Sequence, residues 1–507
     1  MKITERKAAL VASILASSMA LIDSSALNVA LPEIQSQLGL TGIQLLWVVN
    51  AYLLFLASLM LAGGALGDLY GKKRVFAIGI AAFAGASLGC GLSTSGGMLI
   101  VLKGIQGIAG ALMVPGSLAL ITAVYPAEKR GQAIGYWSMF SAITTITGPA
   151  IGGYLASIGF WRGVFFINIP LAAIAFFLLL KYVREPKIRE VNSSPDWRGA
   201  VLSSLGFTGI VYAFLQAGEV GLGKWHIWLI FAVGVGMLIA FFRQEKKTDY
   251  PMLNLSMFNN YTFSAAAALT FLVYGGLGVF MYFLPLNLIE HQGYTPLQAG
   301  IAVLPFGGLI AILAPLTGKW SDKNGYKIPL IIGPLITGAA LTGMTFLERT
   351  EGWGAYVTTF LPFMVMAGVG MGMTVVPVTS AIMGSVDEED SGTASGISNA
   401  MSRLSGVIAL SVVGMLSLIY FETEVLNAFS SENLSDSQWI QLQDEAAKFS
   451  GSEASELPKK IQEKAKTVFR TAFYSAFDRS CYIAAGLCFV GSLIALFFIP
   501  SGKLDDQ

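Results

Sequence analysis

Charged residues are scarce in this chain. Asp, Glu, Lys and Arg together make up 12% of its 507 residues, whereas hydrophobic side chains make up 54% and the mean hydropathy is +0.65. A soluble protein cannot bury that much apolar surface, but lipid accepts apolar side chains, and a helix satisfies its own backbone there. The composition excludes a soluble multidomain protein and predicts an all-α polytopic membrane protein.

Cysteine and histidine are nearly absent. Cys90, Cys481 and Cys488 lie in apolar runs without metal-ligand spacing, so we expect neither disulfides nor a metal site. His226 and His291 form no cluster, and the chain has no phosphate-binding glycine loop followed by Lys-Ser/Thr and no nucleophile elbow. The formal charge of +1 without a basic domain argues against a nucleic-acid partner. These absences argue against an enzyme or an ATP-driven pump and predict no cofactor.

Long apolar runs fill most of the chain, and a span needs about 20 such residues. The runs lie near residues 8–31, 46–66, 75–93, 98–124, 131–155, 162–182, 197–216, 226–243, 261–288, 297–317, 327–347, 355–381, 393–420 and 474–499. We therefore expect fourteen transmembrane helices.

The connections between these runs differ in their content of Lys and Arg. With the N-terminus inside, twenty basic residues fall on the cytoplasmic side and its flanks, against Arg162, Lys224 and Arg349 outside. Cytoplasmic loops carry the excess of Lys and Arg in membrane proteins. Both termini are therefore predicted to be cytoplasmic.

Two charged turns repeat one frame, G-x-x-x-D-x-x-G. The turn after the second run has Gly64, Asp68 and Gly71, and the turn after the tenth has Gly318, Asp322 and Gly325. A second pair of similar stretches begins at Pro115 and Pro377, which supports duplicated halves. Duplicated halves are typical of transporters, with the substrate site at their interface. We expect an N-terminal six-helix bundle (1–182), two inserted helices with linkers (183–260), a C-terminal six-helix bundle (261–499) and a tail (500–507).

Several motifs resemble those of one family. "GALGDLYGKKR" (64–74) resembles the helix 2–3 motif of the major facilitator superfamily, and "LIDSSALNVALP" (21–32) and "GPAIGG" (148–153) resemble motifs of its fourteen-helix drug:proton antiporters. "FWRGVFFINIP" (160–170) and "GISNAMSRLSGVIALSVVG" (396–414) are also similar to that family. The resemblance covers nearly the whole chain. It implies the major facilitator fold in a bacterial cytoplasmic membrane and, we expect, a functional monomer that binds a small molecule and protons.

The charged turn at residues 64–74 has two possible roles: it sets the membrane topology, or it forms part of a cytoplasmic gate. The resemblance implies that Asp68 and its basic neighbours latch the two halves together on the cytoplasmic side. Asp68 could cap the helix that starts near Ser391, and the basic groups could pair with the acidic run 387–390. The residues assigned to this cytoplasmic gate are Gly64, Asp68, Gly71, Lys72, Lys73, Arg74, Arg130, Asp322 and Arg403. For Arg403 we favour a gating or structural role over substrate contact.

Asp23 is the carboxylate deep inside the first run. A charge at that depth costs about 2.5–3.5 kcal/mol on insertion scales, so it should face a cavity or a partner. Burial disfavours the charged form of a carboxyl group and so favours proton uptake. The resemblance implies a proton-coupling role, with Lys103 at a position where the family usually has Arg. Two alternatives stay open: Asp23 as a structural group, and Lys103 in a buried pair or reaching the interface.

The central cavity is expected to contain polar and aromatic side chains. The candidates are Asp23, Asn28, Tyr52, Gln106, Trp137, Met139, Tyr274 and Tyr282. In "TGPAIGG", Gly148 and Gly152 allow close helix approach, and the resemblance implies that Gly148, Pro149, Gly152 and Gly153 seal the cavity against proton leak.

The long connection 421–473 is expected outside. Its residues Ile461, Ala465, Val468, Phe469 and Ala472 recur at helical spacing, which indicates either an amphipathic helix on the membrane face or a solvated surface loop. The whole pattern predicts a proton-coupled exporter of amphiphilic small molecules, of the multidrug type. The alternative is an exporter of an endogenous lipid, siderophore or metabolite.

Overall fold

The chain is helical throughout the part that the structure describes. This computed structural model describes residues 4–185, 196–248, 253, 255–347, 353–386, 391–432, 434–452, 454, 457 and 459–500. Its first helices are α1 (Glu5–Leu38), α2 (Gly42–Tyr70), α3 (Lys72–Gly91), α4 (Gly96–Val124), α5 (Ala127–Ser157), α6 (Gly163–Phe166) and α7 (Asn168–Tyr182). They are followed by α8 (Trp197–Val220), α9 (Trp225–Glu245) and η1 (Leu255–Asn259). The remaining elements are α10 (Tyr261–Leu286), η2 (Asn287–His291), α11 (Pro296–Ala302), α12 (Leu304–Asn324), α13 (Lys327–Met344), η3 (Trp353–Ala355), α14 (Phe360–Met383), α15 (Ser391–Phe429), α16 (Asp436–Ala447), η5 (Phe449–Gly451) and α17 (Lys459–Phe498).

The fourteen expected membrane crossings are present as helices. Thirteen helical stretches among the described residues are long and apolar enough to span a bilayer, with α6–α7 and α11–α12 each forming one of them. The fourteenth is α5, whose 31 residues run alongside α1. The sequence prediction of an all-α polytopic fold is therefore confirmed.

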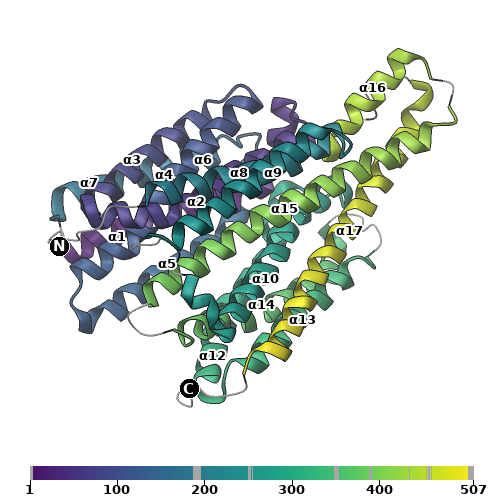
Figure 1. Ribbon diagram of the computed structural model, residues 1–507. Helices are drawn as coiled ribbons and strands as arrows, with labels where there is room; N and C mark the ends of the chain where they lie inside the picture. Colours follow the sequence, from purple (N-terminus) through teal and green to yellow (C-terminus); the bar gives the residue numbers. More distant parts are fainter. Residues whose placement is uncertain are drawn as a thin grey trace.

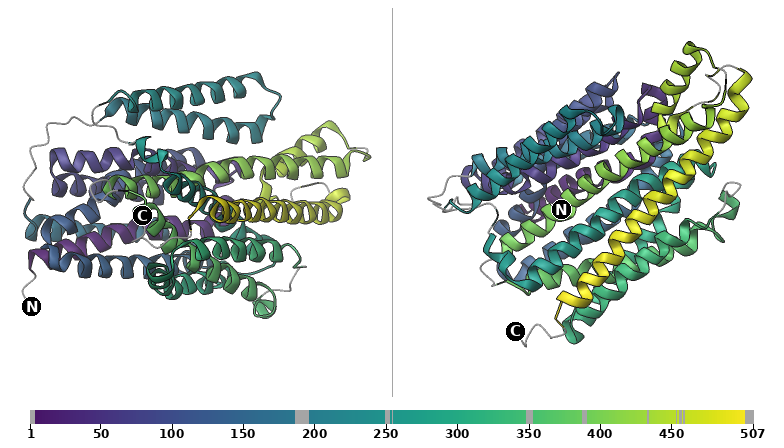
Figure 2. Two further views of the ribbon diagram at one scale, coloured as in Figure 1. Left: turned by 60° about the horizontal axis from the view of Figure 1, so that its bottom comes forward. Right: turned by 45° about the vertical axis from the view of Figure 1, so that its right-hand side comes forward.

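The helices form two halves with an added pair. Helices α1–α7 pack together, as do α10–α15 and α17 (Figure 1). The α8–α9 hairpin lies along the edge of the bundle, and α8 packs against α2 of the first half and α15 of the second (Figure 2). The inserted pair therefore covers a seam between the halves.

The repeated charged turns have the same backbone geometry. Gly71 follows α2 with φ = 104°, and Gly325 follows α12 with φ = 85°. Positive φ is strained for residues with a side chain but not for glycine. The glycine that ends each frame therefore lets the chain reverse directly into the next helix.

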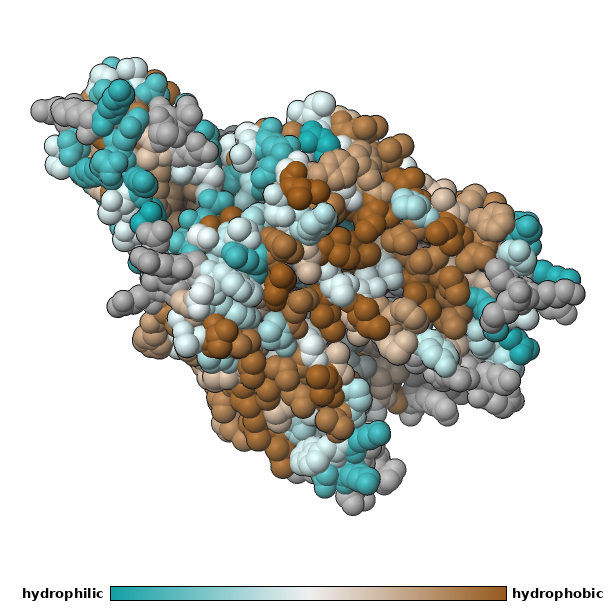
Figure 3. All heavy atoms as spheres, turned by 180° about the vertical axis from the view of Figure 1, so that it is seen from behind, coloured by the Kyte–Doolittle hydropathy of each residue, from teal (hydrophilic) through white to brown (hydrophobic). Residues whose placement is uncertain are grey.

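The molecule has two distinct ends. Both termini lie at one end, which we call the termini end, and α16 lies at the opposite end, which we call the far end (Figure 1). Apolar residues gather over the middle of the face seen in Figure 3, with hydrophilic residues at the extremities. This distribution suits a bilayer around the middle.

Most of the connection 421–473 is helical and projects from the bundle at the far end, where η5 contacts α1 and α2. Helix α15 continues to Phe429, α16 follows, and α17 starts at Lys459 (Figure 1). Ile461, Ala465, Phe469 and Ala472 are buried within this hairpin. The helical spacing was read correctly, but the membrane-face interpretation is wrong, because the apolar side is covered by the protein itself.

Candidate functional site

Asp23 lies in a closed polar network inside the first half. The Lys103 ammonium is 2.5 Å from Asp23 Oδ2, and Gln106 Nε2 donates to Asp23 Oδ1 at 2.8 Å. Lys103 also donates to Gln106 Oε1 at 2.8 Å. All three side chains are fully buried. A buried ion pair is stable only when further hydrogen bonds satisfy its remaining atoms, and Gln106 supplies them on both sides.

Two further polar residues extend this network. Ser87 of α3 accepts a hydrogen bond from Gln106 Nε2 at 2.8 Å and another from Asn168 Nδ2 of α7 at 3.2 Å. Neither residue was among the sequence candidates. Asn168 lies in the stretch "FWRGVFFINIP". An amide side chain within such an apolar run could have indicated a buried polar contact. The sequence around Ser87 did not indicate such a contact, because serine is common in membrane helices.

Tyr52 of α2 lies between this network and a central cavity. The Lys103 Nζ atom lies 4.4 Å from the centre of its ring, within cation–π range. Tyr52 also lines the cavity. Its hydroxyl is buried and has no hydrogen-bond partner among the residues that the structure describes. The aromatic ring therefore separates the ion pair from the cavity.

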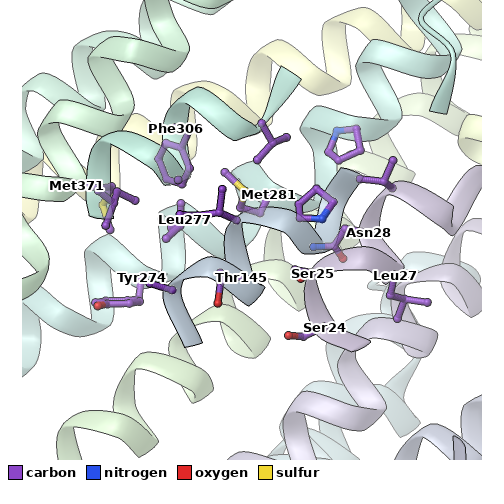
Figure 4. A pocket seen from close by; sticks show the side chains of 18 of the residues that line it. Ser24, Ser25, Leu27, Asn28, Thr145, Tyr274, Leu277, Met281, Phe306 and Met371 are labelled. Carbon is purple, nitrogen blue, oxygen red and sulfur yellow. The ribbon is translucent and has the colours of Figure 1, made fainter. Parts of the chain in front are cut away.

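The central cavity has a volume of about 470 Å³ and lies between the two halves. Ser24, Ser25 and Asn28 of α1 contribute polar groups, and Met281 and Leu277 of α10 face them (Figure 4). The lining residues are Ser24, Ser25, Leu27, Asn28, Val29, Val49, Tyr52, Leu53, Ala142, Thr145, Ile146, Pro149, Tyr274, Leu277, Met281, Pro285, Val303, Phe306, Gly307, Ile310, Ala311, Met371 and Val375. None of these described residues is charged, and the Oδ1 atom of Asn28 is buried without a partner.

The sequence candidates for this cavity separate into two groups. Asn28, Tyr52 and Tyr274 line it, whereas Asp23 and Gln106 lie behind Tyr52 in the closed network. The remaining three candidates do not line it. Trp137 Nε1 donates to Ser17 Oγ at 2.9 Å, Met139 is 47% exposed, and Tyr282 is buried in the core beside Phe283.

The "GPAIGG" glycines of α5 are contact points for two helices. A Cβ atom on Gly148 would lie 1.8 Å from Ser25 Oγ, and one on Gly152 would lie 2.1 Å from the Ala26 carbonyl oxygen, both in α1. Gly153 faces the second half instead, where its Cβ would lie 2.3 Å from the carbonyl oxygen of Pro296 in α11. Only glycine permits such approaches, so α5 joins α1 to the second half.

Among the described residues, several close glycine contacts between the halves lie toward the far end. A Cβ atom on Gly300 of α11 would lie 2.2 Å from the Pro149 carbonyl oxygen. A Cβ on Gly42 of α2 or Gly414 of α15 would meet Leu418 or Leu46 of the opposite helix at 2.6–2.8 Å. Met139 of α5, toward the termini end, is 47% exposed.

The predicted gate is only partly visible. The acidic run 387–390 and the side chains of Asp68, Arg130 and Asp322 lie outside the described residues. The Glu185 carboxylate accepts hydrogen bonds from the backbone N–H groups of Lys73 and Arg74, at 2.9 and 3.1 Å. Glu185 thus caps α3, a role that sequence reasoning missed because 111 residues or more separate the partners.

Arg403 of α15 faces the first half. It lies eleven residues, or three helical turns, before Gly414, and so on nearly the same side of α15 as that contact with α2. The side chain is half-buried, and it has no ion-pair or hydrogen-bond partner within the part of the chain that the structure describes.

Comparisons with known proteins agree with this architecture. The model of the Major Facilitator Superfamily matches residues 13–410. The multidrug resistance protein Stp of Mycobacterium tuberculosis is 32% identical over 80% of this chain and 74% of its own. The tetracenomycin C resistance and export protein of Streptomyces glaucescens is 29% identical over 94% of this chain and 89% of its own.

Solved structures with the same fold cover almost the whole chain. A bacterial homologue of the human lysosomal transporter Spinster has a TM-score of 0.67 at 18% identity, covering 99% of this chain and all of its own. The xylose transporter XylE from E. coli has a TM-score of 0.60 at 14% identity, covering 97% of this chain and 96% of its own. Together with the sequence matches, they show that the chain is a transporter-type membrane protein that belongs to the Major Facilitator Superfamily and is related to its drug-resistance exporters.

Proposed function

We propose that this protein exports amphiphilic small molecules across a bacterial cytoplasmic membrane, driven by the proton gradient. The observation that supports it most directly is the buried Asp23–Lys103–Gln106 network directly behind a wall residue of the central cavity. The names of the related resistance and export proteins favour the same direction of transport. The distribution of Lys and Arg predicts that both termini are in the cytoplasm.

With that orientation, we interpret the arrangement of the two halves as an inward-facing state. The glycine-mediated contacts between the halves are then on the extracellular side. A lipophilic molecule would enter the cavity from the cytoplasm or the inner leaflet. Rocking of the halves about the cavity would then expose it outside.

Because of the Asp23–Lys103 ion pair, binding of a proton to Asp23 would change the position of neighbouring side chains. Protonation of Asp23 leaves the Lys103 ammonium buried without a counter-charge, and breaking a buried pair costs about 3–5 kcal/mol. Lys103 also contacts the Tyr52 ring, so its displacement moves the wall of the cavity. Proton binding and cavity shape are thereby linked. One charge moving through 100 mV supplies about 2.3 kcal/mol.

Efflux from energised cells tests this function. Cells that produce the native chain should extrude lipophilic dyes and antibiotics, and a protonophore should abolish the extrusion. Asp23→Asn, produced to the same level, should lose it, whereas Lys224→Gln on the exposed α8–α9 connection should retain it. Native rates of export by Asp23→Asn would refute the assignment of Asp23 as the proton-coupling group.

A further inference from the structure

The far-end hairpin reaches from one half of the molecule to the other. It is continuous with α15 and α17 of the second half (Figure 2). Its short segment η5 nevertheless contacts α1 and α2 of the first half. A Cβ atom on Gly42 of α2 would lie 2.9 Å from the Cβ atom of Phe449 in η5. The hairpin therefore belongs to the second half by chain connection and is attached to the first half by contact.

Gln35, near the end of α1, is the centre of this attachment. Its Nε2 atom donates to the carbonyl oxygens of Lys448 at 2.5 Å and Leu40 at 3.0 Å, and its Oε1 atom accepts from Ser450 Oγ at 2.8 Å. Gln35 is 3% exposed and Ser450 is 7% exposed. A Cβ atom on Gly451 would lie 2.8 Å from Gln35 Cδ. A single buried carboxamide thus joins the α1–α2 turn to the hairpin.

This attachment has to break when the two halves separate at the far end. Continuous helices of 39 and 40 residues carry the hairpin, so it moves with the second half. Phe449 and Ser450 also line a polar pocket of about 160 Å³, together with Glu290, Lys466 and Arg470. Water in a polar pocket of that size can replace the lost hydrogen bonds. The exchange of protein partners for water makes the attachment reversible.

We propose that Gln35 latches the far end closed. The η5 segment binds the Gln35 carboxamide while the cavity is open toward the termini end, and it releases the carboxamide each time the cavity opens at the far end. Gln35 is a positioning residue, because it acts through the hairpin and does not line the cavity. This inference rests on the proposed export function and assigns it a gate at the end of the molecule opposite the charged turns.

A distance measurement tests the latch without any transport assay. Spin labels at Thr94, in the exposed α3–α4 turn of the first half, and at Ile440, on the exposed side of α16, report the separation of the two parts. The purified full-length protein is studied in nanodiscs. Gln35→Ala should raise the ratio of separated to closed molecules about fivefold or more, since it loses its hydrogen bonds to the hairpin. Ser450→Ala should act in the same direction by a smaller factor.

Gln37→Ala is the matched control, two residues farther along the same helix. The partners of the Gln37 side chain among the described residues are Glu33, Gly159, Trp161 and Arg162, all of which belong to the first half. Its loss should lower the melting temperature and leave the ratio of separated to closed molecules as in the native protein. A purely structural role of Gln35 would give the same result as this control.

A covalent bridge tests whether the latch has to open during export. Gln35→Cys and Ser450→Cys are combined and joined by a short bifunctional thiol reagent, and the native cysteines among the described residues are buried. The bridge should stop export that was present before it formed, and a reductant should restore it. The control bridge replaces Glu432 and Lys464, whose charged groups are 2.8 Å apart within the hairpin. It should leave export unchanged, because both residues move with the second half.

The latch and the proposed function can fail separately. Continued export with the bridge between positions 35 and 450 in place, or an unchanged ratio in Gln35→Ala, would overturn the latch and leave proton-coupled export intact. An equal rise in the ratio for Gln37→Ala would also overturn it, because the effect would then be general loosening. A native protein that exports nothing, together with a rise specific to Gln35→Ala, would refute the proposed function and retain the latch.

Discussion

Gly152 of α5 lies against the carbonyl group of Ala26 in α1, three residues beyond Asp23, so closely that a methyl group would be 2.1 Å from the oxygen. On the other side of the same motif, Gly153 lies against Pro296 of the second half. Helix α5 therefore connects the segment that carries the buried acid to the opposite half. A movement of α11 relative to the first half must shift α5, α1 or both.

Replacing Gly152 by Ala should disturb this connection. The added methyl has no room beside a backbone carbonyl, and overpacking in a tight interior costs about 1–3 kcal/mol. We expect a lower melting temperature in detergent and a loss of most proton-coupled efflux. Gly236→Ala in α9 is the matched control, since nothing lies within 4 Å of its Cβ position. Unchanged stability and efflux in Gly152→Ala would contradict the close packing.

The buried ion pair predicts a non-additive pair of substitutions. Lys103→Met leaves the Asp23 carboxylate buried without its partner and should destabilise the protein by about 3–5 kcal/mol. Adding Asp23→Asn should recover a large part of that loss, because no isolated charge remains. Thermal unfolding of the two single variants and the double variant measures the coupling. Simple addition of the single effects would argue against the pair.

Phe449 of η5 holds the far-end hairpin onto the bundle. It has φ = 58°, is 3% exposed, and contacts the rings of Phe283, Phe421 and Phe473. Phe449→Ala should cost about 3–5 kcal/mol of local stability. Hydrogen exchange of the α16 amides should accelerate, whereas Ile440→Ala on the exposed side of α16 should change it little. Native exchange rates in Phe449→Ala would show that other contacts hold the hairpin.

Glu185 predicts a local effect at the start of α3. Its carboxylate satisfies two backbone N–H groups there, and losing a helix cap costs about 0.5–2 kcal/mol. In Glu185→Ala the amides of Lys73 and Arg74 should exchange faster with solvent, and in Glu185→Gln, which keeps an acceptor oxygen, the change should be smaller. Equal protection in all three proteins would exclude the cap.

Much of this fold follows from the sequence, and the reasons are physical. Apolar length alone determines where a chain crosses a bilayer, so the run that became α1 was recognisable without any contact information. The turns at the ends of the two charged frames were also recognisable locally, because each ends in a glycine, Gly71 or Gly325, and both glycines have positive φ. Features of this kind depend on a few neighbouring residues.

The site depended on contacts that no local pattern encodes. Asp23 and Lys103 were both singled out, and their pairing was left open because 80 residues separate them. The spacing of Ile461 and Ala465 revealed an apolar side, but a helical period does not say whether lipid or protein covers it. Tyr282 and Tyr52 look alike in sequence, yet Tyr52 lines the cavity and Tyr282 does not.

Helices α15 and α17 have 39 and 40 residues, which corresponds to rods of about 60 Å, twice the thickness of a hydrocarbon core. A small tilt of rods this long moves their projecting tips several times farther than it moves side chains near the pivot. In the proposed orientation, with both termini in the cytoplasm, an antibody fragment or a pair of fluorophores attached near α16 would therefore report on transport cycles from outside intact cells, at a place remote from the substrate cavity.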